Sequence, residues 1–158
     1  MVLSKNRLIL LFRAAIIGET SFHVQCTGQI DSGDFGPLDY LYCRYSFQFG
    51  NDWSIASGLD TGLSQTACKN GSRPHDPIAW NFPIDITFKT TNVYGWPRIA
   101  LSVYGIDFLG RDVIRGYGSA LIPLTTGQHQ IEVEMYAPLA TSTLNHIASL
   151  LMGNPPEV

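Results

Sequence analysis

Two segments with a two-residue repeat of apolar side chains constrain the fold most. Large apolar residues alternate with polar or small ones in residues 84–89 and again in residues 98–103. The apolar positions are Ile84, Ile86 and Phe88 in the first segment and Ile99, Leu101 and Val103 in the second. Because successive strand side chains point to opposite faces, this repeat predicts two strands, each with one face toward a core and one toward water.

The same alternation recurs along the chain and sets the fold class. It marks residues 22–27, 41–49, 113–124 and 131–135, with a shorter strand near residues 59–67. Turn formers at residues 31–34 end the first of these strands, and residues 125–128 resemble a hairpin connection. Six or seven short strands with few helices predict an all-β, antiparallel β-sandwich, with a closed barrel as the alternative.

Two local features add detail to this prediction. Gly116 and Gly118 lie inside a predicted strand, which indicates a bulge or a close backbone approach. Near the C-terminus one helix is expected, because apolar residues recur there at helical spacing. They are Leu144, Ile147, Ala148 and Leu151.

Residues 1–20 are predicted to be an N-terminal extension outside the core. Lys5 and Arg7 precede an apolar run, as in a signal peptide, but Arg13 splits that run into two halves too short for a signal-peptide core. The folded domain is therefore expected over residues 21–153, followed by a tail at residues 154–158. A secreted protein is the alternative, and in it Asn70-Gly71-Ser72 would be a glycosylation site.

Composition argues against several classes of function. Ten Lys and Arg against thirteen Asp and Glu give a net charge of −3, which offers no electrostatic reason to bind nucleic acid and little attraction to anionic membranes. Three cysteines without a Cys-x-x-Cys spacing indicate neither a disulfide framework nor a zinc site. A reducing intracellular compartment is the simplest interpretation.

No pattern of catalytic or metal-binding residues stands out, so we expect no enzyme, no cofactor and no metal. The chain has neither a Gly-x-Ser-x-Gly elbow nor a Gly-x-Gly-x-x-Gly loop. Aspartates occur in two predicted turns and would have to converge to hold calcium, which takes roughly 6–8 oxygen ligands. Asp is also common in turns for local hydrogen bonding, and the irregular spacing favours that explanation.

The aromatic residues have two readings. Trp53, Trp80 and Trp96 could form a sugar-stacking platform, but packing in a core is favoured because aromatics bury large areas. Tyr42, Arg44 and Tyr104 fall on the predicted outward faces of their strands. Exposed aromatics with arginine are typical of protein–protein interfaces, so these three residues, with Arg115, form the predicted interface.

Six blocks in order resemble the B9 (B-nine) domain family. They are residues 40–45 (Tyr-Leu-Tyr-Cys-Arg-Tyr), 48–53 (Gln-Phe-Gly-Asn-Asp-Trp), 80–89, 92–97 (Asn-Val-Tyr-Gly-Trp-Pro), 101–105 and 113–118. The resemblance runs from about Phe22 to Gly153. It implies a sandwich similar to the lipid-binding C2 (C-two) fold and a non-enzymatic role without catalytic residues.

The resemblance also implies partners and a place in the cell. Family members assemble with one another and with tectonic-type membrane proteins in the Meckel-syndrome complex. That complex lies at the basal body and transition zone of the cilium, where it forms a diffusion barrier and supports cilium assembly and Hedgehog signalling. We therefore expect a cytoplasmic adaptor that binds other B9 domain proteins, with at most a weak contact with a membrane surface.

Two alternatives and one departure from the family complete the expectations. A peripheral phospholipid-binding module would need the aspartate-bearing turns to meet Arg98, Arg111 and Arg115 at one rim. The family also continues beyond the helix with a further apolar strand, which we expect to be missing here. We expect that gap to leave a sheet edge or a groove unpaired, and to lower stability or create dependence on a partner.

Overall fold

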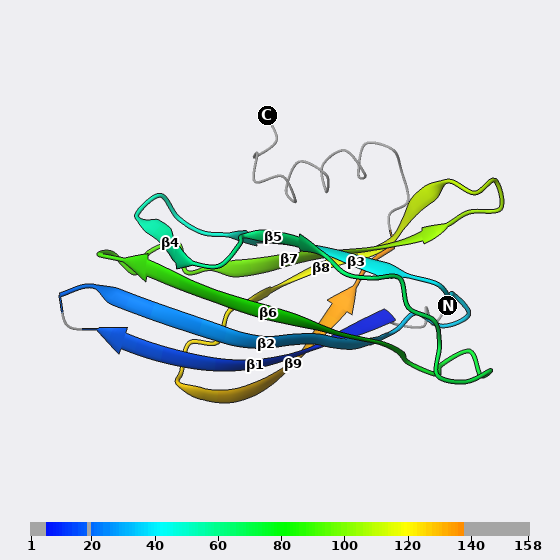
Figure 1. The fold of residues 1–158 in the computed structure, drawn as a ribbon, viewed down its shortest axis with the longest axis horizontal. Helices are drawn as coiled ribbons and strands as arrows, with labels where there is room; N and C mark the ends of the chain where they lie inside the picture. The colour runs from blue at the N-terminus through cyan, green and yellow to red at the C-terminus, as the bar shows by residue number, and fades with distance from the viewer. Residues whose placement is uncertain (1–5, 19, 138–158) are drawn as a thin grey trace.

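The computed structural model describes residues 6–18 and 20–137, which form nine strands in two layers (Figure 1). The strands are β1 (Asn6–Gly18), β2 (Phe22–Asp34), β3 (Tyr42–Gln48), β4 (Trp53–Ser57), β5 (Thr61–Leu63), β6 (Ile78–Thr90), β7 (Arg98–Ile106), β8 (Asp112–Leu121) and β9 (Gly127–Met135). One sheet has the order β4-β6-β2-β1-β9 and the other the order β5-β3-β7-β8. Neighbouring strands are antiparallel in both, so the predicted antiparallel β-sandwich is confirmed.

The prediction that residues 1–20 lie outside the core is wrong for residues 6–18. These residues form β1, which lies between β2 and β9 and pairs with both. Leu8, Leu10, Phe12 and Ala14 alternate along β1, and each is at most 2% exposed. Arg13 breaks the apolar run in sequence, but in the strand it lies on the exposed outer face while its neighbours Phe12 and Ala14 are buried on the inner face.

The alternating segments at residues 84–89 and 98–103 form strands, β6 and β7, as predicted. In β6 the apolar positions are buried, and Asp85 and Lys89 are exposed. In β7 the expectation of a solvated face is wrong, because Ala100 and Ser102 are also buried. Ile114 and Tyr117 of β8 pack against Ala100. The short side chain of Ala100 is therefore covered by longer side chains of the adjacent strand β8.

The three tryptophans pack inside the sandwich, which contradicts the sugar-platform alternative. Trp53 and Trp80 are buried, and Trp96 packs edge-on against Trp53 with ring centroids 5.3 Å apart. Each indole N–H donates to a backbone carbonyl: Trp53 to Tyr94, Trp80 to Leu41 and Trp96 to Ile122. These bonds satisfy the polar end of each ring, which allows the rings to be buried.

Both turn predictions need correction. The strand expected to stop before residue 31 continues to Asp34, because a bulge in the pairing with β1 absorbs Asp31 as an extra residue. Residues 125–128 do not close a hairpin, since β8 and β9 belong to different sheets.

The glycine prediction for β8 is confirmed. The register of β8 against β7 shifts beside Gly116. A side chain at Gly118 would press against the backbone and Met135 of β9. The two sheets therefore approach each other closely at this point.

The predicted C-terminal helix, the end of the domain at residue 153 and the tail at residues 154–158 lie outside the described residues. The expected unpaired groove is not found between β2 and β9, where β1 pairs with both strands.

Candidate interaction surfaces

Three of the four predicted interface residues lie together on the outer face of the β5-β3-β7-β8 sheet. Tyr42 of β3 is directly opposite Tyr104 of β7, and their rings stack with centroids 5.3 Å apart and planes 15° apart. Arg44 follows two residues along β3, and its side chain is exposed. We call the hollow that they line the tyrosine hollow; it has a volume of about 410 Å³. Its other lining residues are Thr61, Gly62, Leu63 and Asp112.

The tyrosine hollow combines both signs of charge with aromatic surface. Burial, and next the charge of the Asp112 carboxylate, raise the pKa of the Tyr42 phenol. The phenol therefore keeps its proton at neutral pH and remains a hydrogen-bond donor. Leu63 adds an apolar side chain that is 57% exposed. This mixture suits a protein partner, and an interface role for Tyr42, Arg44 and Tyr104 stays a prediction.

Arg115 does not join this group. It is the extra residue of the β8 bulge, between the pairs Val103–Gly116 and Tyr104–Ile114. Its guanidinium donates to the carbonyl of Ile106 at 3.3 Å, and its stem lies against Gly105. The bulge therefore turns Arg115 toward the end of the sandwich instead of the tyrosine hollow.

The aspartate-bearing turns lie at the same end of the sandwich (Figure 1, right), but their carboxylates serve local bonds. Asp34 accepts from the N–H of Gly36, Asp39 from that of Tyr40, and Asp107 from those of Leu109 and Arg111. Within residues 6–18 and 20–137, no three His, Cys, Asp or Glu side chains gather where a cation could be held. Local hydrogen bonding is what the sequence favoured for these residues.

The basic rim required by the lipid-binding alternative does not form as predicted. Arg98 begins β7 opposite Leu121, whereas Arg111 lies in the turn after the other end of β7. β7 takes eight steps from residue to residue between these ends, which is roughly 26 Å at 3.3 Å per step. The guanidinium of Arg111 is also paired with Asp107, at 3.1 Å.

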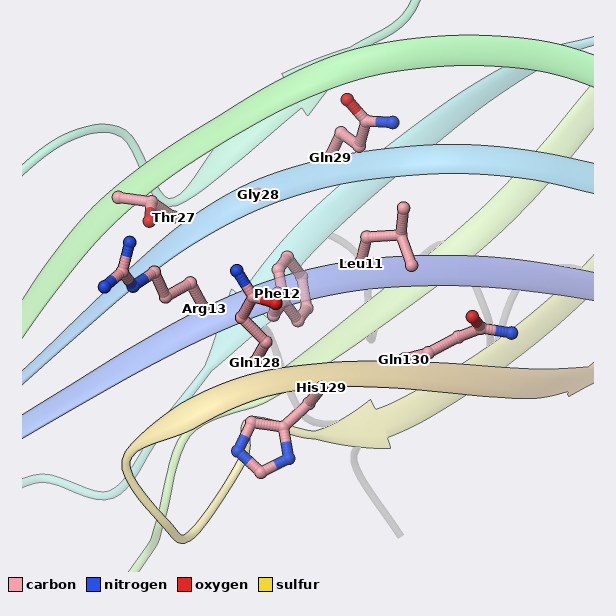
Figure 2. Close-up of a pocket in the computed structure, with 9 residues that line it drawn as sticks. All are labelled: Leu11, Phe12, Arg13, Thr27, Gly28, Gln29, Gln128, His129 and Gln130. Atoms are coloured by element: carbon pink, nitrogen blue, oxygen red, sulfur yellow. The ribbon is translucent and has the colours of Figure 1, made fainter.

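A second hollow lies on the outer face of the other sheet, over β2, β1 and β9 (Figure 2). Its volume is about 650 Å³. Leu11 and Arg13 of β1 form its middle, with Thr27 and Gln29 on one side and amide side chains of β9 on the other. The β9 residues are Gln128 and Gln130. Thr27 and Gln128 lie opposite Arg13 on the two neighbouring strands. Among the described residues, none of these three side chains has an acidic partner.

Sequence reasoning missed this second hollow because it removed residues 1–20 from the fold. The signal was present, since Leu8, Leu10, Phe12 and Ala14 recur at every second position. The residues between them are also partly apolar, as in a strand at the centre of a sheet. The run was therefore interpreted as an N-terminal extension, with a signal peptide as the alternative.

Two buried thiols complete the chemistry of the interior. Burial, with a smaller contribution from Asp85, raises the pKa of Cys26 to about 12. Burial also raises the pKa of Cys43, which donates weakly to the carbonyl of Arg44. Cys68 is exposed, and all three cysteines are free. The two buried thiols therefore stay protonated and unreactive at neutral pH.

In the part of the chain that the structure describes, no helix is long and apolar enough to cross a membrane.

Comparison with known proteins gives consistent matches over most of the chain. A family model described as "Ciliary basal body-associated, B9 protein" matches residues 24–158. B9 domain-containing protein 1 of Mus musculus is 48% identical over 136 residues, which cover 86% of this chain and 66% of that protein. The Xenopus laevis protein of the same name is 45% identical over 140 residues, covering 89% and 70%. B9 domain-containing protein 2 of Danio rerio is 30% identical over 131 residues, covering 83% and 73%.

This chain therefore spans about two thirds of the length of the mouse and frog relatives that it matches.

Proposed function

We propose a structural role at the cilium from one premise: the chain belongs to the B9 family of ciliary basal body-associated proteins. The proposed function is that of a non-enzymatic adaptor subunit in the tectonic-like complex of the ciliary transition zone. Its partners would be other B9 domain proteins and the membrane proteins of that complex, reached from the cytoplasmic side. Cilium assembly, the diffusion barrier and Hedgehog signalling would depend on it through these contacts.

One observation carries this proposal. The match to the family model extends from residue 24 to residue 158, and relatives named B9 domain-containing protein 1 are 45–48% identical. The tyrosine hollow adds support, since it offers aromatic rings and an exposed arginine to a protein partner. A family that also contains B9 domain-containing protein 2 makes a related domain the first partner to test.

Rescue of ciliated cells that lack their own B9 domain-containing protein 1 tests the proposal. The tagged chain should collect at the basal body, restore the number of cilia and copurify with B9 domain-containing protein 2. Diffuse staining without rescue or copurification would contradict the proposed role.

A pair of matched variants tests the tyrosine hollow in the same cells. Arg44→Glu changes an exposed arginine inside the hollow, and Arg13→Glu makes the same change on the opposite sheet. If the tyrosine hollow is the interface, Arg44→Glu should lower copurification severalfold and Arg13→Glu should not. The reverse pattern would move the interface to the other sheet.

Peripheral membrane contact is the second candidate function, and the turn between β7 and β8 favours it. Phe108 is 94% exposed at the tip of this turn, beside the exposed Leu109. The carboxylate of Asp107 accepts from the N–H groups of Leu109 and Arg111, so the turn satisfies its own backbone. The N–H of Arg111 is the main reason that the pKa of Asp107 lies below its usual value. Such a tip loses few hydrogen bonds to water when it enters an apolar surface.

Vesicle flotation with and without calcium separates this function from the adaptor role. Leu109 and Leu124 are both 60% exposed, and Leu124 lies outside this turn, in the connection between β8 and β9. Membrane contact through the β7–β8 turn predicts flotation that Leu109→Asp abolishes and Leu124→Asp preserves. An adaptor without membrane contact predicts little flotation of any variant.

A further inference from the structure

β1 occupies a position that the matched part of the chain does not supply. The family match begins at residue 24, whereas β1 covers Asn6–Gly18 and lies between β2 and β9. β2 and β9 do not pair with each other, because β1 pairs with both of them. The matched region alone would therefore expose two facing strand edges, separated by the width of one strand. Such edges are templates for a further strand.

We propose that the gap between β2 and β9 is a binding site for an extended apolar strand, filled in this chain by β1. The ligand is any polypeptide segment that carries the inward pattern of β1, and a partner protein can supply it. Backbone hydrogen bonds to both edges would give affinity, and the inward side chains would give specificity, as in other cases of strand addition.

The residues that face β1 define which side chains the site accepts. Phe12 lies opposite Gly28 of β2, and a Cβ atom at Gly28 would overlap both the Leu11 carbonyl and the Phe12 ring. Because Gly28 has no side chain, there is room for an aromatic ring at the centre of the strand. Two residues further on, Ala14 lies between Cys26 and Gly127.

On the other side of Phe12, Leu10 lies between Ile30 and Ile131, and Leu8 lies between Gly33 and Val133. Leu8 and Leu10 are both fully buried. The site therefore accepts two large aliphatic residues, then an aromatic one, then a small one, at alternate positions. A strand shifted by one residue would place Arg13 and Leu11 in the core instead.

β1 is joined to the rest of the domain through a short connection. Gly18 pairs with Phe22, so three residues separate the two strands. The cysteines are free, and none of them lies in β1. Cleavage of the connection would therefore leave β1 held by hydrogen bonds and packing alone.

The test uses the full chain with a specific protease site in place of residues 19–21. The probe is a fluorescent synthetic peptide of residues 6–18 with a lysine tail for solubility, followed by anisotropy. The cleaved chain should take up the probe in a saturable way and release its own β1, whereas the uncleaved chain should not. Two unlabelled competitors have the same length and charge: the peptide with Leu11→Asp and the peptide with Phe12→Asp.

The two competitors distinguish a specific binding site from non-specific hydrophobic binding. Because residue 12 points inward and residue 11 outward, the Phe12→Asp peptide should compete at least about a hundredfold more weakly than the Leu11→Asp peptide. Equal competition by the two peptides would overturn the proposal. So would equal uptake by the uncleaved chain, or release of β1 from a cleaved chain that then takes up no probe.

Discussion

Replacing Phe12 by alanine measures directly whether β1 belongs to the core. The Phe12 side chain is 2% exposed and packs within the main hydrophobic cluster. Truncating a buried phenylalanine to alanine costs about 3–5 kcal/mol, and the cost rises when neighbours cannot fill the cavity. Gly28 lies opposite and has no side chain to move into that space. We therefore expect Phe12→Ala to lower the free energy of unfolding by about 4–5 kcal/mol.

Denaturation in urea, followed by tryptophan fluorescence, measures this loss. A thermal scan should show a midpoint lower by about 10–15 °C, since about 1 kcal/mol corresponds to 2–4 °C in a domain of this size. The control is Leu11→Ala, the next residue along the strand, whose side chain lies on the outer face and is only partly buried. It should cost about 1 kcal/mol or less. If the two variants unfold alike, the placement of β1 in the core is refuted.

Three further predictions follow from the structure. The free energy of unfolding should fall as pH rises from 9 toward 12, because burial raises the pKa of Cys26 from 9.0 to about 12 and only the unfolded chain ionises readily over that range; urea titrations at pH 8 and 10 check this, and Cys26→Ala should make the slope shallower, with the buried Cys43 thiol contributing the remainder. Trp80→Phe removes the bond from the indole N–H to the Leu41 carbonyl and should cost about 1–2 kcal/mol, whereas an unchanged denaturation midpoint would argue that the bond is dispensable. Asp107→Ala should speed hydrogen exchange at the amides of Leu109 and Arg111 while global unfolding stays the same, and unchanged exchange there would contradict the bonding of that turn.

The sequence predicted the strands whose two faces differ in polarity. β6 shows this best, since Ile84, Ile86 and Phe88 are buried while Asp85 and Lys89 are exposed. In such a strand, the alternation of apolar and polar residues shows which face is buried and which is exposed. The same reasoning placed Tyr42 and Tyr104 on the outward faces of their strands, and the structure adds that these two strands pair side by side.

The strands that the sequence misjudged are those without this difference. β1 has apolar residues on both faces, so its two-residue repeat is masked and the segment resembles a targeting signal. In β7 the short side chains of Ala100 and Ser102 gave no warning that neighbours would bury them. Arg115 lies apart from the other three predicted interface residues because it is the extra residue of the β8 bulge; Gly116 indicated a bulge but not which residue would be the extra one.

The central position of β1 also has a consequence for biosynthesis. Residues 6–14 pair with residues 127–135, so the first strand made must wait for the last one described here. At about 5–20 residues per second, roughly 6–24 s pass between the synthesis of these two segments. During that time β1 is paired with β2 on one side, and its other edge, which later pairs with β9, has no partner strand. An unpaired apolar edge of this kind favours aggregation until β9 has been made.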